Sequence, residues 1–188
     1  MNVYDFDGTL YDGESALDFF LFRMKKRPLL ARYIPSTLRG IVGYKRHGVT
    51  IDEIAGRYGK IFQACLEGIE DYQATSKAFW DKYEDCICAF YQDIQQPDDL
   101  IISAGPEQSL GEICARLGIA HYIGTVFNEE SGELEFLCFG ENKVKAFRER
   151  WPGREIDNFY TDSMNDKPLM DIARHAFLVK KGALTQLK

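Results

Sequence analysis

The sequence predicts an α/β fold, a doubly wound parallel sheet that carries an inserted lobe made entirely of helices. A short apolar strand opens the chain at residues 2–6. Residues 14–94 then show helical patterns only, and from residue 99 onward short apolar strands alternate with helices, as they do in doubly wound sheets. We therefore expect a Rossmann-like core of residues 1–13 and 95–188, with residues 14–94 forming a helical cap domain.

The opening strand runs directly into two carboxylates, Asp5 and Asp7. Because the side chains of a regular strand alternate between its faces, the two could not both point at one ligand if the strand continued. Gly8 ends the strand, and the turn that it permits can bring Asp7 over the same site as Asp5. The alternative is a plain Asp-Gly turn in which Thr9 caps a helix.

Aromatic side chains recur at helical spacing through the predicted cap. Helices are expected over about residues 14–26, from Ile51, and over about residues 71–93. The third helix carries the stripe Tyr72, Phe79, Trp80, Tyr83, Ile87 and Phe90. We interpret such stripes as the core of the helical lobe, because packed interiors are a far commoner origin of this pattern than a cofactor site.

The second half of the chain alternates strands and helices. Helices are expected to begin near Pro106, Gly140 and Pro168. The expected strands are residues 100–102, 122–127, a returning hairpin arm at 134–138, 156–160 and a final strand at 176–179. Since ligands bind at the carboxyl ends of the strands in such sheets, the polar residues at these ends form the candidate site.

Asp5 and Asp7 predict phosphoryl-transfer chemistry. Asp5 would attack phosphorus and form an aspartyl-phosphate, while Asp7 would protonate the leaving oxygen and then deprotonate the attacking water. An anionic nucleophile reacts poorly with an anionic phosphate, so a Mg²⁺ ion is expected to cancel charge between them.

Ser103 and Lys143 are expected to bind the phosphate. The Ser103 hydroxyl and the Ala104 and Gly105 amides precede a predicted helix, whose N-terminus favours bound anions. The alternative role of Ser103 is a helix cap. Lys143 opens another helix, where a cation faces an unfavourable dipole unless an anion lies nearby. The alternative for Lys143 is a solvated surface position.

The polar loop after the strand at 156–160 contains Asp162 and Asp166. One of these carboxylates can bind Mg²⁺ directly, and the other can lie beside the ion as an additional acid. Magnesium keeps several waters and takes few protein ligands, so the Asp5 carboxylate, the Asp7 main-chain carbonyl and Asp162 suffice. The alternative is a capped loop that leads into a helix.

The run from Asp5 to Leu10, Asp-Phe-Asp-Gly-Thr-Leu, resembles the first motif of the haloacid dehalogenase superfamily, whose members are mostly phosphatases. Ser103, Lys143 and then Asp162 with Asp166 follow it in the order that the superfamily uses. The resemblance thus extends over the whole chain.

Residues 124–125, 132 and 138–143 look most like the phosphoserine-phosphatase-like branch (subfamily IB), which inserts a helical cap just after the first motif. The resemblance implies these roles: Asp5 as nucleophile, Asp7 as acid/base, Thr9, Ser103, Ala104, Gly105 and Lys143 as phosphate contacts, Asp5, Asp7 and Asp162 as Mg²⁺ ligands, and Asp166 as an additional acid.

The chain departs from phosphoserine phosphatases near the first motif. Gly8 stands where those enzymes usually have serine, and their substrate-binding arginine motif is missing from the cap. Glu14 has the spacing of their substrate-binding glutamate, nine residues after Asp5, but its neighbours do not match. We therefore do not expect serine phosphate as substrate, and keep Glu14 as a candidate substrate contact.

Composition limits the kinds of binding partner and the cellular compartment expected for the protein. A net charge of −6 argues against nucleic-acid binding. The five cysteines have no metal-ligand spacing and indicate reduced thiols in a cytoplasmic protein. The first strand starts at residue 2, which leaves no room for a signal peptide, and no apolar run approaches the roughly 20 residues of a membrane span. The expected partner is a small phosphorylated metabolite.

Residues 23–46 carry eight lysines and arginines and no acidic residue. We interpret this stretch as a solvated basic face. The alternative is peripheral contact with an anionic membrane, in which case the substrate would be a phospholipid head group of the phosphatidylglycerophosphate kind.

Two further alternatives stay open. A phosphotransferase or mutase would share the same site residues, and only its products would differ. A receiver-like signalling module also phosphorylates an aspartate on a doubly wound sheet, but it needs no acid/base two residues on and no helical cap.

Overall fold

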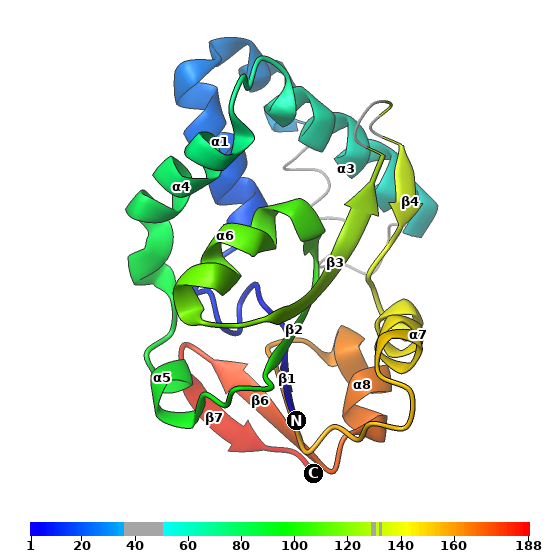
Figure 1. Ribbon diagram of the computed structural model, residues 1–188. Helices are drawn as coiled ribbons and strands as arrows, with labels where there is room; N and C mark the ends of the chain where they lie inside the picture. The colour runs from blue at the N-terminus through cyan, green and yellow to red at the C-terminus, as the bar shows by residue number, and fades with distance from the viewer. Residues whose placement is uncertain (36–50, 129–130, 132) are drawn as a thin grey trace.

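In the part of the chain that the structure describes, residues 1–35, 51–128, 131 and 133–188, seven strands form one sheet in the order β4-β3-β2-β1-β5-β6-β7. The coordinates are a computed structural model (Figure 1). The strands are β1 (Asn2–Tyr4), β2 (Leu100–Pro106), β3 (His121–Phe127), β4 (Leu134–Phe136), β5 (Asn158–Thr161), β6 (His175–Lys180) and β7 (Ala183–Gln186).

The central strands of the sheet are parallel, and its two edges are antiparallel. Val3 of β1 lies opposite Leu100 of β2 on one side and Phe159 of β5 on the other. The strand β3 extends the parallel set beyond β2, and β6 extends it beyond β5. The predicted α/β fold with a doubly wound sheet is therefore confirmed, and β4 is the expected hairpin arm.

The strand β7 was not predicted, because the sequence indicated a final strand at residues 176–179. It pairs antiparallel with β6 through a tight turn at Lys181 and Gly182, whose φ angles are 50° and 75°. Positive φ at both central positions is typical of the two-residue turns that join hairpin strands. All four residues of β7 are exposed, so the strand has no apolar face that a pattern could reveal.

Helices cover both faces of the sheet. On one face lie α5 (Phe90–Ile94) and α6 (Glu107–Leu117), which share a core with Tyr4. On the other face lie α7 (Glu141–Arg150) and α8 (Lys167–Ile172), which pack around Val3, and the 3₁₀ turn η3 (Met164–Asp166) leads into α8. The neighbours Val3 and Tyr4 are both fully buried, one on each face, as strand alternation requires.

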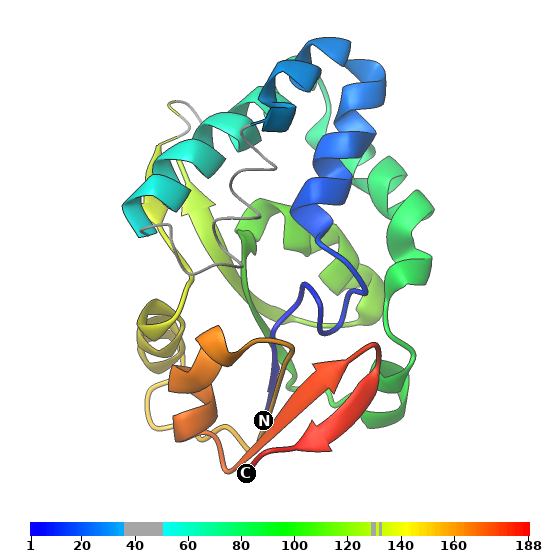
Figure 2. The same cartoon turned by 180° about the vertical axis from the view of Figure 1, so that it is seen from behind.

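The helical lobe stands beyond the carboxyl ends of β1 and β2 (Figures 1 and 2). Its described elements are α1 (Ser15–Lys26), the 3₁₀ turn η1 (Pro28–Tyr33), α3 (Ile51–Leu66), α4 (Tyr72–Tyr83) and the 3₁₀ turn η2 (Glu84–Cys86). The helices of the described residues agree with the predicted cap, and its boundaries at residues 14 and 94 stay a prediction. Residues 36–46 of the basic stretch lie outside the described residues.

The single helix expected over residues 71–93 is wrong, since α4 ends before η2 and α5 starts anew. Between them the chain pairs with the segment after the first motif. The Cys88 amide donates to the Leu10 carbonyl at 2.7 Å, and the Asp12 amide donates to the Cys86 carbonyl at 2.8 Å. These bonds hold the chain in an extended conformation that a continuous helix could not adopt.

Polar contacts tie the helical lobe to the core. The Arg116 side chain on α6 forms ion pairs with Asp81 at 2.8 Å and Glu84 at 2.5 Å. The Trp80 indole on α4 donates to the Ser109 carbonyl on α6 at 3.3 Å. Because these bonds join α4 to α6 at several points, the lobe has a defined position over the end of the sheet.

Candidate active site

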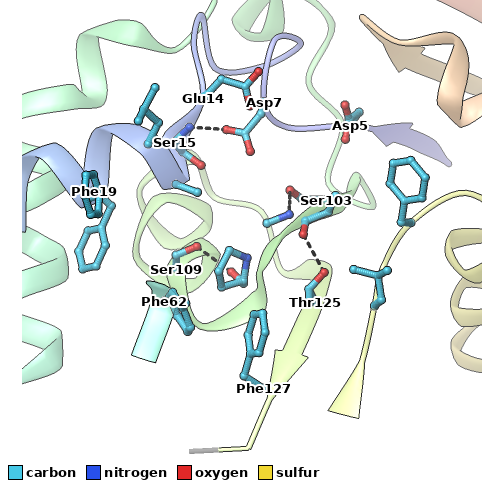
Figure 3. Close-up of a pocket in the computed structure, with 18 of the residues that line it drawn as sticks. Asp5, Asp7, Glu14, Ser15, Phe19, Phe62, Ser103, Ser109, Thr125 and Phe127 are labelled. Atoms are coloured by element: carbon cyan, nitrogen blue, oxygen red, sulfur yellow. Dashed lines mark hydrogen bonds between the residues drawn. The ribbon is translucent and has the colours of Figure 1, made fainter. Parts of the chain in front are cut away.

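Asp5 and Asp7 follow β1 and line one cavity at the end of the sheet. Gly8 has a φ of +73°, and its amide donates to the Tyr11 carbonyl at 2.8 Å, so the chain reverses directly after Asp7. The Ser15 amide, at the start of α1, donates to Asp7 Oδ1 at 2.7 Å. The turn at Gly8 thus brings both carboxylates to the same cavity, as the sequence predicted (Figure 3).

Lys143 on α7 is buried and lies between two carboxylates. Its ammonium group is 2.9 Å from Asp5 Oδ1 and 2.8 Å from Asp166 Oδ1. The Thr161 hydroxyl donates to the second oxygen of Asp166 at 2.9 Å. Burial alone would lower the pKa of Lys143, but the two carboxylates raise it above its ordinary value, so the ammonium stays charged. The surface alternative for Lys143 is wrong, and the expected anionic partners are present.

Asp162 follows β5 and lines the same cavity. Its carboxylate packs against the backbone of Gly8, where a Cβ atom would lie 2.3 Å from Asp162 Oδ2. Gly8 is therefore needed twice, once for its positive φ and once because no side chain fits in front of Asp162. The three segments that carry Asp5, Asp162 and Lys143 are far apart in sequence and meet at this cavity.

Ser103 and its two neighbours form the end of β2, where the pairing register with β3 shifts. The Ser103 hydroxyl accepts a hydrogen bond from the Gly105 amide at 3.0 Å. A Cβ atom on Gly105 would lie 3.6 Å from Asp7 Oδ2, so this turn stands beside Asp7. The alternative of Ser103 as a helix cap is wrong, because α6 begins at Glu107 and Pro106 occupies its cap position.

Thr125 supports this turn from β3. Its hydroxyl donates to the Ala104 carbonyl at 2.7 Å and accepts from the Cys138 amide at 3.2 Å. Thr125 also lines the cavity, and the sequence indicated no role for it beyond the Gly-Thr resemblance. A buried threonine with its hydroxyl in two hydrogen bonds has no signal in sequence, because its partners come from segments distant in the chain.

Thr9 and Glu14 were both expected to contact the substrate, and they differ in whether they line the cavity. Thr9 is fully buried, does not line the cavity, and its hydroxyl has no hydrogen-bond partner among the described residues. The Thr9 amide donates to the Phe6 carbonyl at 3.2 Å in this turn, and the role of Thr9 as a phosphate contact stays a prediction. Glu14 lines the cavity and is exposed just before α1, where a substrate could reach it.

Carboxylates dominate the charge of the cavity. The pKa of Asp5 is raised to about 8, chiefly by burial, while Lys143 lowers it and the neighbouring Asp166 and Asp162 add to the rise. Burial also raises the pKa of Asp7, against the hydrogen bond from the Ser15 amide. Among the described lining residues, the one cation is Lys143, and the acidic side chains are Asp5, Asp7, Glu14, Asp162 and Asp166.

Such an excess of carboxylates over ammonium groups fits a divalent cation, because a bound ion would compensate the buried negative charge whose loss of hydration raises these pKa values. In the described part of the chain, no three histidine, cysteine, aspartate or glutamate side chains form a ready metal cluster. The expected Mg²⁺ ligands include only two side chains, Asp5 and Asp162, with the Asp7 carbonyl as a third ligand. The residues present therefore fit this ion.

A comparison with protein families places residues 3–171 within the model described as haloacid dehalogenase-like hydrolase. Two curated proteins of Mycobacterium tuberculosis, one named a probable phosphatase and one uncharacterized, are each 33% identical over 90 residues. That match covers 44% of this chain and 31% of each relative, so the chain spans about a third of their length.

Solved structures share the fold at low identity. A protein of unknown function from Bordetella pertussis Tohama I superposes with a TM-score of 0.72 at 20% identity, covering 91% of this chain and 85% of its own. A phosphoserine phosphohydrolase-like protein from Francisella tularensis has a TM-score of 0.54 at 22% identity, with coverages of 94% and 86%. A phospho-aspartyl intermediate analogue of phosphoserine phosphatase has a TM-score of 0.52 at 15% identity, with coverages of 93% and 83%.

Proposed function

Because the chain belongs to the haloacid dehalogenase-like hydrolase family, we propose that it is a phosphatase that hydrolyses a phosphomonoester through a phosphorylated Asp5. The observation that carries this proposal is the buried Asp5 carboxylate, held by Lys143 at 2.9 Å, in one cavity with Asp7. Nucleophile and acid/base thus reach one substrate from a single turn of chain.

Asp5 acts as the nucleophile in this proposal. Lys143 donates a hydrogen bond to Asp5 Oδ1. No described residue donates a hydrogen bond to the second oxygen, Asp5 Oδ2, so this atom can attack phosphorus. Burial raises the pKa of Asp5, and a further cation beside Lys143 would lower it, which favours the anionic carboxylate that attacks phosphorus. The carboxylates of Asp5 and Asp162 and the main-chain carbonyl of Asp7 would hold Mg²⁺, which cancels charge on both phosphate and nucleophile.

Asp7 acts as the acid and base. The Ser15 amide fixes Asp7 Oδ1 at 2.7 Å, which leaves Oδ2 on the side of Gly105 and the phosphate site. Its raised pKa, caused by burial, suits a group that must first hold a proton. Asp7 gives this proton to the leaving oxygen, then takes one from the water that attacks the phosphorylated Asp5.

The decisive experiment replaces the two aspartates separately. Asp5→Asn should release no phosphate from an aryl phosphate, because an amide is a poor nucleophile. Asp7→Asn should still become phosphorylated by a reactive aryl phosphate but should not be dephosphorylated, so intact-protein mass should rise by one phosphoryl group. If Asp5→Asn keeps most of the wild-type rate, the proposed mechanism is wrong.

Metal removal gives an independent test of the same proposal. A chelator should abolish phosphate release, and Mg²⁺ should restore it better than Ca²⁺, whose larger and looser coordination misplaces Asp5 against phosphorus. Full activity in the presence of chelator would contradict the metal requirement.

A hydrolase, as opposed to a phosphotransferase or mutase, should transfer the phosphoryl group to water even when other alcohols are present.

The membrane alternative stays a prediction, because part of the basic stretch, residues 36–46, lies outside the described residues. Arg23 is buried and donates to the Cys65 carbonyl at 2.8 Å, and Arg27 donates to the Glu67 carbonyl at 2.9 Å. Both cations thus bind the carboxyl end of α3, where the helix dipole favours them. In the described residues, no helix has the length and apolar character to cross a bilayer. A cytoplasmic location and a small phosphorylated substrate are part of the proposal.

A further inference from the structure

The wall of the cavity opposite the carboxylates is aromatic. The cavity has a volume of about 520 Å³, within the range of sites that hold small molecules. Toward the helical lobe it is lined by Phe19, Phe20, Phe62, Phe79, Trp80 and Phe127. In Figure 3, Phe19, Phe62 and Phe127 lie away from Asp5, on the side of the helices and the end of β3. We call these six residues the aromatic wall.

The aromatic wall is a packed and preformed surface. Phe62 of α3 lies 5.2 Å from Phe127 of β3 between ring centroids, and Phe19 of α1 lies 5.3 Å from Phe79 of α4. The polar atom of Trp80, its indole nitrogen, already donates to the Ser109 carbonyl. The wall therefore offers the substrate apolar contact area and no side-chain hydrogen-bond donor of its own.

Charged substituents would be poorly accommodated beside this wall. Lys143 is the one lysine or arginine among the described lining residues, and it is already paired with Asp5 and Asp166. A carboxylate on the substrate would lose its hydration, find no described cation that is not already paired, and face Glu14 and Asp7. An apolar group in the same place would instead be removed from water against aromatic rings.

We propose that the substrate is a phosphate monoester of an apolar alcohol, with its hydrocarbon part against the aromatic wall and its phosphate at Asp5. This inference rests on the proposed phosphatase function and adds the substrate class. It distinguishes the chain from an enzyme for phosphorylated amino acids, sugars or hydroxy acids, which would need polar or cationic groups where the aromatic wall stands.

The first arm of the test measures phosphate release from n-alkyl phosphates of three to ten carbons, whose leaving groups are chemically alike. We expect kcat/KM to rise about 2–4-fold per added methylene and to level off once the cavity is filled. O-phosphoserine and glycerol phosphate should be poorer substrates than hexyl phosphate by at least 10-fold. A rate independent of chain length, or a preference for phosphoserine, would overturn the inference and leave the phosphatase function standing.

The second arm measures binding without turnover. Alkyl phosphonates are not hydrolysed, and their binding to the wild-type protein with Mg²⁺ can be followed by calorimetry. Affinity should rise with chain length and should fall when the chain ends in a carboxylate. If this trend holds but no phosphate ester is hydrolysed, the proposed function fails and the apolar site stands. Equal binding of all phosphonates would overturn the inference.

Two variants of α3 test the wall itself. Phe62→Ala should reduce the preference for octyl over propyl phosphate by about 10-fold, with little change in the rate on propyl phosphate. The matched control is Leu66→Ala, one turn further along α3, at a half-buried side chain that does not line the cavity. It should keep the preference. If Phe62→Ala is unstable, the milder Phe62→Leu should show a smaller change in the same direction, and an unchanged preference in a folded variant would contradict the role of the wall.

Discussion

The two sides of the cavity are lined by different kinds of side chain. The side of the sheet presents charged groups at strand and helix ends, and the ammonium of Lys143 is fixed within 2.9 Å of two carboxylates. The side of the helical lobe presents aromatic rings whose centroids lie about 5 Å apart. The first arrangement is directional and tolerates little displacement, whereas the second depends on area removed from water and tolerates changes of shape.

This difference separates chemistry from selection. A change in the charged side should affect every substrate alike, because every substrate presents the same phosphate to Asp5. A change in the aromatic wall should affect substrates according to their alcohol part. The helical lobe can therefore alter substrate preference while the reaction stays the same.

Among the changes that test this comparison, the largest effect is expected from removing the cation of the charged side. Lys143→Met leaves the buried Asp5 and Asp166 without their shared partner, so it should lower kcat by about 10²–10³ on all substrates. The same change should lower the free energy of unfolding by about 3–5 kcal/mol, as expected when one partner of a buried ion pair is lost. Phosphate release and urea denaturation, measured side by side, check the two expectations.

The matched control for this change is Lys145→Met. Lys145 lies two residues further along α7 and is exposed, so its replacement should change neither kcat nor stability appreciably. An effect of similar size in both variants would mean that the charge of α7 as a whole matters, and would contradict the specific role of Lys143.

A smaller effect on activity is expected from a change at Gly8, in the turn that packs against Asp162. Gly8→Ala places a Cβ atom only 2.3 Å from Asp162 Oδ2 and imposes a positive φ on alanine. The displaced Asp162 should raise the Mg²⁺ concentration needed for half-maximal activity. The left-handed backbone should also lower stability by about 1–2 kcal/mol.

Gly153→Ala is the control that separates the backbone strain of Gly8→Ala from the displacement of Asp162. Gly153 has a φ of +77° and no neighbour within 4 Å of a Cβ atom, so it carries the backbone strain without the clash. Its replacement should reduce stability by a similar amount and leave the Mg²⁺ requirement unchanged. A shifted Mg²⁺ requirement in both variants would show that loss of stability, and not displacement of Asp162, is the cause.

Much of the charged side could be predicted from the sequence. Strand ends in a parallel sheet meet at one edge, and this rule alone predicts that Asp5, Asp162 and Ser103 lie together. The partners of Lys143 were predicted only as some anion, because the distance between a lysine and a carboxylate 138 residues away depends on tertiary packing. Thr9 as a phosphate contact stays a prediction, since a motif shows which residues occur but not which way a tight turn directs them.

The aromatic wall could not be predicted in the same way. Helical periodicity showed that α1 and α4 have apolar faces, and we interpreted them as core, which Phe19 and Phe79 partly are. Periodicity does not show what an apolar face meets, and Phe62 meets Phe127 from a strand that follows 65 residues later. The end of the helix before η2 was not predicted for a related reason. Its cause is a hydrogen bond between Cys88 and Leu10, which lies in a distant segment.

The smallest effect is expected at the outer contact between the two sides. Arg116 is 17% exposed and joins α6 to Asp81 and Glu84, whose carboxylates are 58% and 50% exposed. Solvent screens such pairs, so Arg116→Gln should lower the free energy of unfolding by about 1 kcal/mol at low salt and by less at high salt. Urea denaturation at the two salt concentrations measures this difference.

The preference for long alkyl phosphates should survive that change. The wall helix α4 is also held to α6 by the Trp80–Ser109 hydrogen bond and by the burial of Trp80 itself, which is 1% exposed. Loss of the outer ion pairs therefore leaves the inner contacts that place the rings. If Arg116→Gln weakened the chain-length preference as strongly as Phe62→Ala, the ion pairs would be what positions α4, and the wall would be a movable surface whose distance from Asp5 is set from outside the cavity.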